Sequence, residues 1–536
     1  MSNLAETIRA DAAARLRLPA GVHPAREKAV YRHFLQFETH RLKLHHRKGA
    51  GGLAICQARA LVLDELLRSL FLALEQATPA SRLAAAPRHA VIAIGGYGRG
   101  ELNPYSDLDV MFLHDERPIS ESNPPWFIEP LTEGLIFDIG LKVGHATRTV
   151  AECVRYANED LRTKTALIEA RRVCGDQRLF EEMQRAILTH CVEGHEEEYI
   201  RARLRDQADR RAKYGDTVCL QEPNIKNGCG GLRDYQNLLW MAFFKDRSRS
   251  LDDLLQRGFI VEEEQRRLAA AYDFILRVRN ELHYHTGRAA DRLLRSVQPA
   301  VARNLGYQDR SPSRRIERFM QNYYLHARTI DLFTRTLEQR LALQPPPHCA
   351  VQGGRTSAAD SGRGSAVSHA DGFHFVNGQI HAESSTVFQD NPIRLLRLFR
   401  HAQQRGLSLH PDLARLVRQN LKRVDRKLRT DPRAHQTFIE ILNQRGNVAR
   451  VVRAMHETGV LGAYRPPFGR LTCLVQHEFF HQYTTDEHTL VCLDKLDEMC
   501  GGGGEPRRAI YGDIFQKEIE RPFILYLAML LHDAGK

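Results

Sequence analysis

Two short motifs in one segment combine residues that could hold a metal ion and a phosphate. In AIGGYGRGELNPYSDLDVMF, residues 93–112, Gly95 and Gly96 follow a β-branched stretch, and Asp107 and Asp109 stand at the head of the next apolar stretch. Glycines let a backbone approach a phosphate closely. Carboxylates at positions i and i+2 of a strand point to one face. Such a pair favours a hard divalent cation, and Mg²⁺ completes its shell with water and phosphate oxygens.

The elements around this segment must bring the glycines and the aspartates together. Ala90 to Ile94 and Leu108 to Leu113 are typical of strands, and Phe137 to Val143 alternates between apolar and polar residues. The first 85 residues and most of 149–342 instead follow the helical period. The sequence therefore predicts an α+β fold, in which a small sheet with helices is embedded in a largely helical chain.

The segment QPPPHCAVQGGRTSAADSGRGSAVSHAD, residues 344–371, marks the clearest domain boundary because it contains almost nothing that could be buried. It is expected to be a flexible linker or an insertion. The expected organisation is a helical N-terminal region at 1–85, a catalytic core at 86–150, a helical nucleotide- or substrate-binding domain at 151–343, this linker at 344–371, a helical connecting region at 372–470 and a last helical unit at 471–536.

Composition excludes several classes of protein. Of the 536 residues, 43% are hydrophobic and 26% are charged, which excludes wholesale disorder. No apolar run reaches the ~20 residues that span a bilayer, and the amino terminus lacks a secretory core, so we expect a cytoplasmic protein that binds no membrane. The ten cysteines form no C-x-x-C pair. The net charge of +12 is dispersed along the chain, so we do not expect a nucleic-acid partner.

The glycine pair and the D-x-D motif, in strand–loop–strand order, together resemble the signature of the DNA polymerase β-like nucleotidyltransferases. The resemblance implies that Asp138, on the polar face of the third predicted strand, is a third metal-binding and catalytic carboxylate. The alternative for Asp138 is a solvated residue at a strand end. Two metals in such a site activate the attacking oxygen and stabilise the leaving pyrophosphate. Arg99 and Ser106, in the loop between the motifs, are candidate phosphate contacts or solvated surface residues.

Further motifs resemble, in order, those of the bacterial uridylyltransferase/uridylyl-removing enzymes that modify the nitrogen regulatory protein PII. The resemblance implies a Mg²⁺-dependent (or Mn²⁺-dependent) enzyme that transfers UMP from UTP to a tyrosine of PII. It also implies an HD-type metal domain that removes the UMP and glutamine-sensing domains that follow it. The matching segments are 95–110, 137–149, 223–240, 277–293, 438–470, 479–490 and 530–536.

The segment PNIKNGCGGLRDYQNLLW, residues 223–240, supplies further candidates for the nucleotide site. Lys226 and Arg233 are candidate triphosphate contacts. Three glycines in the same segment would let backbone N–H groups approach the ligand, although a glycine-rich turn is equally compatible with the pattern; they are Gly228, Gly230 and Gly231. Two histidines of a later helical stretch, His283 and His285, cannot share a helix face and are interpreted as packing or surface residues.

The last unit carries the candidate ligands of the HD-type site. Thr484 and Glu487 have the spacing of a capping box, which would start a helix with His488 in its first turn. An apolar helix opening at Pro522 leads to His532 and Asp533. The resemblance implies that these two residues and His488 bind metal together with an aspartate further along. The sequence supplied ends before such a residue, so we expect an incomplete, truncated HD domain and loss of the uridylyl-removing activity.

Three alternatives to PII uridylylation remain open at this point. Residues 389–402 resemble the helical segment that follows the catalytic head of CCA-adding tRNA nucleotidyltransferases, and basic charge suits a phosphate backbone. The 223–240 segment also resembles one in the glutamine-synthetase adenylyltransferase. The choice between UTP and ATP as the nucleotide substrate is therefore open. A non-catalytic remnant that binds PII or nucleotide is the third alternative, and the intact Asp107 and Asp109 argue against it.

Overall fold

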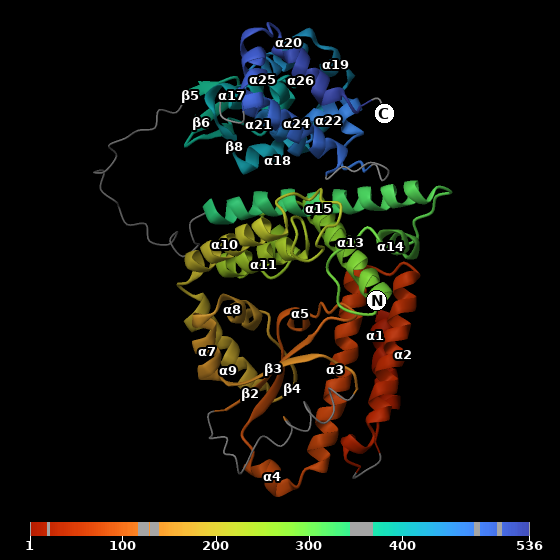
Figure 1. Ribbon diagram of the computed structural model, residues 1–536. Helices are drawn as coiled ribbons and strands as arrows, with labels where there is room; N and C mark the ends of the chain where they lie inside the picture. Colours follow the sequence, from red (N-terminus) through yellow and green to blue (C-terminus); the bar gives the residue numbers. More distant parts are fainter. Residues whose placement is uncertain are drawn as a thin grey trace, which may run out of the picture. The chain divides into compact units, whose positions relative to one another are not determined.

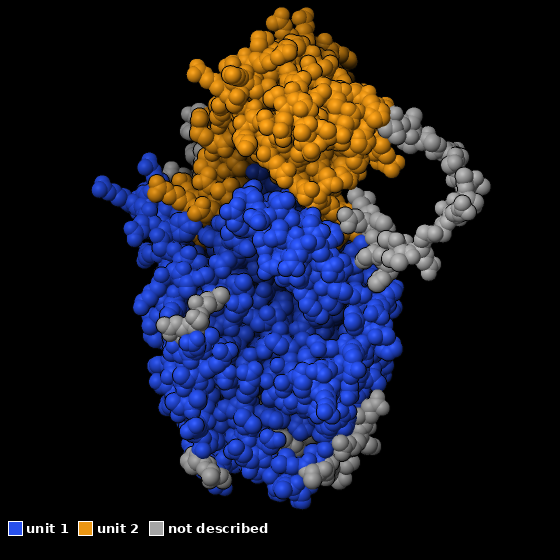
Figure 2. Space-filling view, turned by 180° about the vertical axis from the view of Figure 1, so that it is seen from behind, with its two compact units in different colours: residues 1–218, 222–315, 326–334 blue, residues 219–221, 316–325, 335–536 orange. Residues whose placement is uncertain are grey.

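A computed structural model describes residues 2–18, 22–115, 128, 139–343, 368–475, 483–500 and 506–534. The chain divides into two compact units, which Figure 2 distinguishes by colour. Unit 1 comprises residues 1–218, 222–315 and 326–334, and unit 2 comprises 219–221, 316–325 and 335–536. Helices predominate in both units, and each also has a small mixed sheet, so the α+β class is confirmed. No helix of the described residues is long and apolar enough to cross a membrane.

Unit 1 contains a four-stranded sheet with helices on both faces and a helical segment that follows it (Figure 1). Its strands are β1 (His89–Ala93), β2 (Leu108–His114), β3 (Val143–Thr149) and β4 (Arg171–Gly175). Its helices are α1 (Ser2–Arg15), α2 (Lys28–Arg47), α3 (Gly52–Ala77), α4 (Ala80–Ala85), α5 (Gly95–Gly98), α7 (Val150–Glu159), α8 (Leu161–Ile168), α9 (Gln177–Ile187), α10 (Glu196–Tyr214), α11 (Leu232–Asp246), α12 (Leu251–Gln256), α13 (Glu262–Thr286), α14 (Gln298–Asn304) and part of α15 (Pro312–Leu343), which both units share.

The sheet of unit 1 has the strand order β3-β2-β1-β4. β1 runs antiparallel to both β2 and β4, whereas β2 and β3 are parallel. Successive side chains of β1 and β2 alternate between two buried cores, as a sheet covered on both faces requires. One core contains residues of α1, α2 and α3, and the other contains residues of α7 and α9. The predicted strands at 90–94 and 108–113 are thus confirmed to within one residue at each end.

The third predicted strand lies too early in the sequence. The prediction placed it at residues 137–143, but β3 begins at Val143. Gly140, with a φ of +89°, belongs to a turn at 139–140, and this conformation is incompatible with a strand. Asp138, the predicted third carboxylate, lies outside the described residues. Its assignment as a metal ligand therefore stays a prediction.

The short helix α5 is fixed tightly against its neighbours, which positions the glycine pair at its start. The hydroxyl of Tyr97 donates to Asp64 of α3 at 2.7 Å, and Arg171 of β4 binds the same carboxylate at 2.7 Å. Gly98 touches the backbone of residue 169 so closely that an added Cβ would lie 2.4 Å from the Glu169 carbonyl oxygen. Only glycine fits at this contact.

Unit 2 is a helical domain with a second four-stranded sheet, in the order β5-β6-β7-β8. Its strands are β5 (Ser368–Ala370), β6 (Phe373–Val376), β7 (Gln379–Ala382) and β8 (Ser408–Leu409). Its helices, besides its part of α15, are α16 (Val387–Asp390), α17 (Arg394–Arg405), α18 (Pro411–Gln419), α19 (Arg426–Thr430), α20 (Pro432–Leu442), α21 (Ala449–Glu457), α22 (Val460–Tyr464), α23 (Pro466–Gly469), α24 (Thr485–Met499), α25 (Pro506–Lys517) and α26 (Pro522–Leu531).

This second sheet was not predicted. The sequence predicted a linker as far as residue 371 and helices over 372–470, whereas β5 begins at Ser368 and three more strands follow it. Phe373 and Phe375 are buried in the core of unit 2, whereas His374 and Val376 are only partly buried, so burial alternates with the period of a strand. Residues 344–367 of the expected linker lie outside the described residues.

We predict that Gly98→Ala lowers the free energy of unfolding by at least about 2 kcal/mol, because backbone must move to make room for the methyl group. Gly96→Ala is the matched control. A Cβ at Gly96 meets its nearest atom at 3.5 Å, so we expect a change within about 1 kcal/mol there. Denaturant titration followed by circular dichroism measures both values. Equal effects of the two substitutions would contradict the contact described at Gly98.

Candidate active site

Unit 1 contains a cavity of about 780 Å³ that is lined by both motifs of the sequence analysis. The glycine pair, Ser106 and the two aspartates contribute from the sheet and its loops. Residues of α8, α10, α11 and α13, together with Lys226 and Asn227 of the glycine-rich segment, line the remaining wall. The cavity is sized for a small-molecule ligand, for which 300–1,000 Å³ is typical.

Asp109 lies between two glycines that leave room for its carboxylate. The N–H of Ile94 donates to the Asp109 carbonyl at 3.1 Å, so the turn that follows β1 lies beside the start of β2. A Cβ on Gly95, whose φ is +56°, would lie 3.6 Å from the Asp109 carboxylate, and one on Gly144 would lie 3.0 Å from it. The glycine pair and the D-x-D motif are therefore adjacent in space, as the sequence analysis predicted.

Asp107 and Asp109 form a pair of negative charges that nothing described neutralises. Both side chains are exposed to the cavity, and neither has an ion pair or a side-chain hydrogen bond among the described residues. Partial desolvation and then the charge of Asp107 raise the pKa of Asp109, while Lys226 opposes this shift. Two adjacent carboxylates without a counter-ion fit the ligand set that Mg²⁺ takes from a protein.

Lys226 and Arg233 are positive charges of the same cavity that also lack an ion pair within the described part of the chain. Burial, and then the charges of Arg279 and Arg233, lower the pKa of Lys226. Burial, and then neighbouring Arg99, lower the pKa of Arg233 to about 10. A polyanion would relieve the repulsion between these cations. Both residues thus line the cavity as unpaired cations among the described residues, and their contact with a triphosphate stays a prediction.

Arg99 differs from Lys226 and Arg233 because its guanidinium group already makes ion pairs, and its contact with a phosphate stays a prediction. It donates to both carboxylate oxygens of Glu169, at 2.8 and 2.7 Å, and to Glu101 at 2.9 Å. Although Arg99 lines the cavity, as Ser106 does, these ion pairs hold it as part of the wall. Its charge still acts on neighbouring groups, since it lowers the pKa of both Lys226 and Arg233.

Glu169 and Trp240 connect this ion pair to the cations of the cavity, and the sequence analysis named neither residue. The indole N–H of Trp240 donates to Glu169. The guanidinium groups of Arg203 and Arg233 lie over the Trp240 ring, with 5.2 and 5.0 Å between each Cζ and the ring centroid. These contacts join the end of α8 to α10 and α11, so local sequence patterns contain no signal for them.

The glycine-rich segment folds back on itself rather than presenting its N–H groups to the cavity. The N–H of Gly230 donates to the Asp234 carboxylate at 2.9 Å, and those of Gly228 and Gly231 donate to carbonyls of the same turn, at 2.9 and 3.0 Å. The alternative reading of a glycine-rich turn is therefore correct for these three positions. They fix the backbone between Lys226 and Arg233.

A buried polar network ties the loop that follows α5 to α13. Asn103 donates to Asn280 at 2.7 Å and accepts a hydrogen bond from Arg279, which also binds Asp291 at 2.8 Å. His283 is fully buried, accepts from the N–H of Tyr105 at 3.3 Å, and has its pKa lowered to about 3 by burial. The interpretation of His283 as a packing residue is consistent with this environment.

In unit 2, three predicted metal ligands lie together. One potential ligand atom from each of His488, His532 and Asp533 lies within 4.8 Å of the others. His532 places Nδ1 2.6 Å from the Met529 carbonyl and Nε2 3.0 Å from Asp533, an arrangement that fixes the orientation of its ring. The donor types suit a transition metal ion.

The predicted capping box at the start of α24 is wrong. Thr484 precedes the helix, but its hydroxyl donates to Asp486 at 2.6 Å and accepts no hydrogen bond from an N–H of the first turn. Glu487 accepts from Arg453 of α21 at 2.9 Å. A tertiary ion pair has replaced the local capping interaction.

We predict that Glu169→Gln lowers the free energy of unfolding by about 2–3 kcal/mol, because it removes the charge that compensates a largely buried Arg99. Glu182→Gln is the control. Glu182 pairs with Arg88, and both side chains are 40% exposed, so we expect a loss below about 1 kcal/mol. Trp240 fluorescence, recorded beside the unfolding curve, should change only in the first variant. Unchanged stability and fluorescence in Glu169→Gln would contradict the role assigned to Glu169.

Comparison with known proteins gives evidence on function that is independent of the geometry of the site. Residues 198–338 match a family model described as GlnD PII-uridylyltransferase, and residues 373–464 match one described as the third domain of uridylyltransferase GlnD. The first match covers most of α10 to α15, and the second covers β6 to α22.

Three relatives carry the name bifunctional uridylyltransferase/uridylyl-removing enzyme. The protein of Bradyrhizobium sp. (strain BTAi1 / ATCC BAA-1182) is 35% identical over 497 residues, which are 91% of this chain and 52% of the relative. That of Azospirillum brasilense is 35% identical over 450 residues, 83% of this chain and 47% of the relative. That of Caulobacter vibrioides (strain NA1000 / CB15N) is 33% identical over 491 residues, 91% of this chain and 52% of the relative. The chain spans about half the length of these relatives, and over most of its own length it is similar to GlnD uridylyltransferases.

Proposed function

We propose that unit 1 transfers UMP from UTP to a tyrosine hydroxyl of the protein PII and releases pyrophosphate. The observation that carries this proposal is the pairing of two uncompensated carboxylates with two uncompensated cations in one cavity. A nucleoside triphosphate with its divalent cation supplies the complementary charges. The relatives are named uridylyltransferases, which supports UTP as the nucleotide, and the description of the family model that matches residues 198–338 names PII, which supports PII as the acceptor.

Each group has a definable part in the transfer. Lys226 and Arg233 bind the triphosphate and hold it in place, and positioning with charge neutralisation accounts for most of the catalysis in such transfers. The tyrosine oxygen attacks the α-phosphorus, and the bond from that phosphorus to the bridging oxygen of pyrophosphate breaks. Lys226 and Arg233 also neutralise the charge that develops on the leaving pyrophosphate.

Asp107 and Asp109 would hold the Mg²⁺, or Mn²⁺, that this chemistry requires, with Asp138 as a third proposed ligand. The bound cation supplies charge neutralisation at the reacting phosphate and activation of the attacking oxygen. Asp107 and Asp109 would hold the cation in the part of the cavity that Gly95 also lines. Strand–turn–strand positioning of both motifs supports a polymerase β-like core for residues 86–150.

We predict that Asp107→Asn and Asp109→Asn each reduce transfer to PII by about a hundredfold to a thousandfold, which corresponds to ~3–4 kcal/mol of transition-state stabilisation. Each variant should keep the wild-type circular dichroism spectrum and melting temperature, because neither carboxylate has a partner among the described residues. Asp513→Asn, at an exposed residue of α25, controls for the loss of one carboxylate. Near-wild-type transfer by the double variant would locate the active site elsewhere.

A second proposed function concerns His488, His532 and Asp533, which we propose bind a divalent metal ion as part of an HD-type site. We predict that His488→Ala or Asp533→Asn weakens Co²⁺ binding to this site by at least about tenfold, because each removes a ligand. The visible absorption of Co²⁺ reports imidazole ligands, which the Asp107 site lacks. His33→Ala, an exposed histidine of α2, is the control. Unchanged Co²⁺ spectra in both variants would contradict this assignment.

A further inference from the structure

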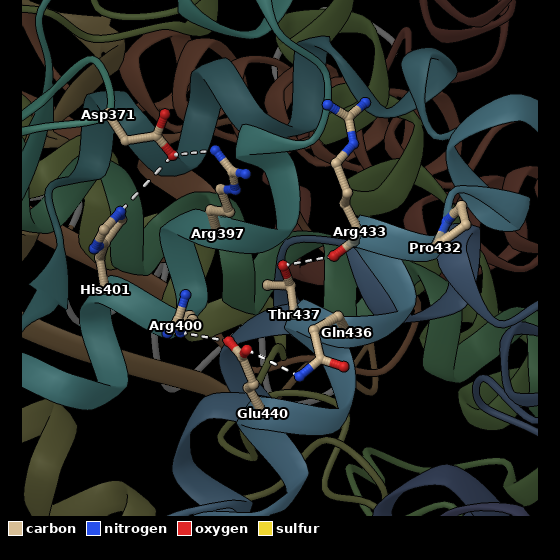
Figure 3. Close-up of a pocket in the computed structure, with 9 residues that line it drawn as sticks. All are labelled: Asp371, Arg397, Arg400, His401, Pro432, Arg433, Gln436, Thr437 and Glu440. Carbon is tan, nitrogen blue, oxygen red and sulfur yellow. Dashed lines mark hydrogen bonds and ion pairs between the residues drawn. The ribbon is translucent and has the colours of Figure 1, made fainter.

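Unit 2 has a separate hollow of about 670 Å³ between α17 and α20, to which neither the proposed transfer nor the metal cluster assigns a role (Figure 3). Six of its nine lining side chains carry N–H or O–H donors, and two are carboxylates. The donors comprise three arginines, a histidine, a glutamine and a threonine. A lining of this kind is suited to an anion with several oxygen atoms.

Arg397 and Arg400 of α17 form one wall. Nη1 of Arg397 lies 3.5 Å from Oδ2 of Asp371, and Nε of Arg400 lies 2.8 Å from Oε2 of Glu440. Within the described residues each arginine makes only this one ion pair, and the two side chains are 35% and 38% exposed. Since a guanidinium group carries five N–H donors, most donors of both groups remain available to a ligand in the hollow.

The two carboxylates orient these arginines rather than fill the hollow. Asp371 lies in the turn between β5 and β6 with a φ of +55°, and it also accepts from Nε of Arg394 at 3.2 Å. Glu440 of α20 accepts from the Gln436 side chain at 3.1 Å. Figure 3 shows these two carboxylates at separate places in the wall. Because partly exposed ion pairs are weak, the arginines can redirect their free donors at little cost.

The first turns of α20 supply the opposite wall. Arg433, Gln436 and Thr437 lie there, at the helix end that carries the positive end of the helix dipole. Arg433 already pairs with Asp431 at 3.0 Å, and the Thr437 hydroxyl donates to the Arg433 carbonyl at 2.9 Å. Arg397 and Arg400 are therefore the principal anion-binding groups, and the residues of α20 are secondary ones.

His401 adds a polar group to the hollow without adding charge at neutral pH. Its Nε2 lies 3.8 Å from Oδ2 of Asp371. Burial, and then the charges of Arg405 and Arg400, lower its pKa against the opposing effect of Asp371. A neutral imidazole can donate one hydrogen bond and accept another. It suits a ligand that carries hydroxyl groups besides its anionic group.

We infer that the hollow between α17 and α20 binds a phosphate-bearing small molecule, with the phosphoryl oxygens between Arg397 and Arg400. Two guanidinium groups three residues apart on one helix face provide the paired donors that a phosphate dianion binds well. The volume lies in the range of small-molecule sites. A hollow of about 670 Å³ holds one small molecule rather than a stretch of polynucleotide, so a small molecule is favoured over RNA.

Residue-resolved protection of arginines tests this inference in the intact chain. The chain is modified with phenylglyoxal in the presence of sodium phosphate, of UMP, or of sodium chloride at equal ionic strength. Peptide mass spectrometry then measures the rate of modification at each arginine. We expect modification of Arg397 and Arg400 to slow about tenfold when the effective probe is at about ten times its dissociation constant. Arg426, an exposed residue of α19 outside the hollow, should react at an unchanged rate. Protection by UMP but not by phosphate identifies a nucleotide as the source of the phosphoryl group, and protection by phosphate alone at similar concentration identifies the free anion.

Paired variants provide the control for charge. Arg397→Gln with Arg400→Gln should abolish phosphate- or UMP-induced protection of Arg433, whereas Arg426→Gln with Lys427→Gln, which removes the same charge from exposed positions, should preserve it. If the double variant of Arg397 and Arg400 fails to fold, the protection measured in the wild-type chain still tests the inference. Equal protection of Arg397, Arg400 and Arg426, or none, would overturn the inference. Protection by an RNA oligonucleotide but by neither small molecule would also overturn it. The readout does not involve nucleotidyl transfer, so it is independent of the proposed function.

Discussion

The candidate active site depends on opposite charges that share one cavity without neutralising each other. Asp107 and Asp109 remain unpaired among the described residues, as do Lys226 and Arg233, although Lys226 is close enough to influence the pKa of Asp109. Collapse into ion pairs would lower the electrostatic energy of the empty protein and would also remove the site. Holding such charges apart requires a rigid surrounding structure, and a cation together with a polyanion is the ligand that satisfies both sets at once.

The rigid surrounding comes from contacts between distant parts of unit 1. Glu169 holds Arg99 and Trp240, and Asn103 links the loop after α5 to Asn280 and Arg279 of α13. Glycines allow the closest of these approaches, as at Gly98. The charge of Arg99 is balanced by two glutamates, yet it still acts on the cations that face the ligand.

The sequence predicted the parts of the fold and of the site that depend on local pattern. The strands near 90–94 and 108–113 and the adjacency of the glycine pair to Asp109 follow from strand periodicity and spacing. The third strand was predicted too early because residues 137–143 alternate between apolar and polar types, although Gly140 lies in a turn. The predicted capping box does not form because Glu487 binds Arg453 instead. Glu169 and Trp240 were missed since contacts between residues 71 positions apart leave no local signal. The sequence of the glycine-rich segment is compatible with a turn and with a phosphate-binding loop. Only the hydrogen bonds of its N–H groups distinguish these two interpretations.

Incubation of PII with this chain, UTP and Mg²⁺, followed by measurement of the mass of PII, tests the proposed transfer. We expect PII to gain the mass of one UMP on a tyrosine, the gain to disappear when Mg²⁺ is omitted, and tRNA in a parallel reaction to remain unlabelled. Unmodified PII together with nucleotide incorporation into tRNA would contradict the account. That result would mean that the charges of the cavity serve a nucleic-acid end instead of a protein hydroxyl.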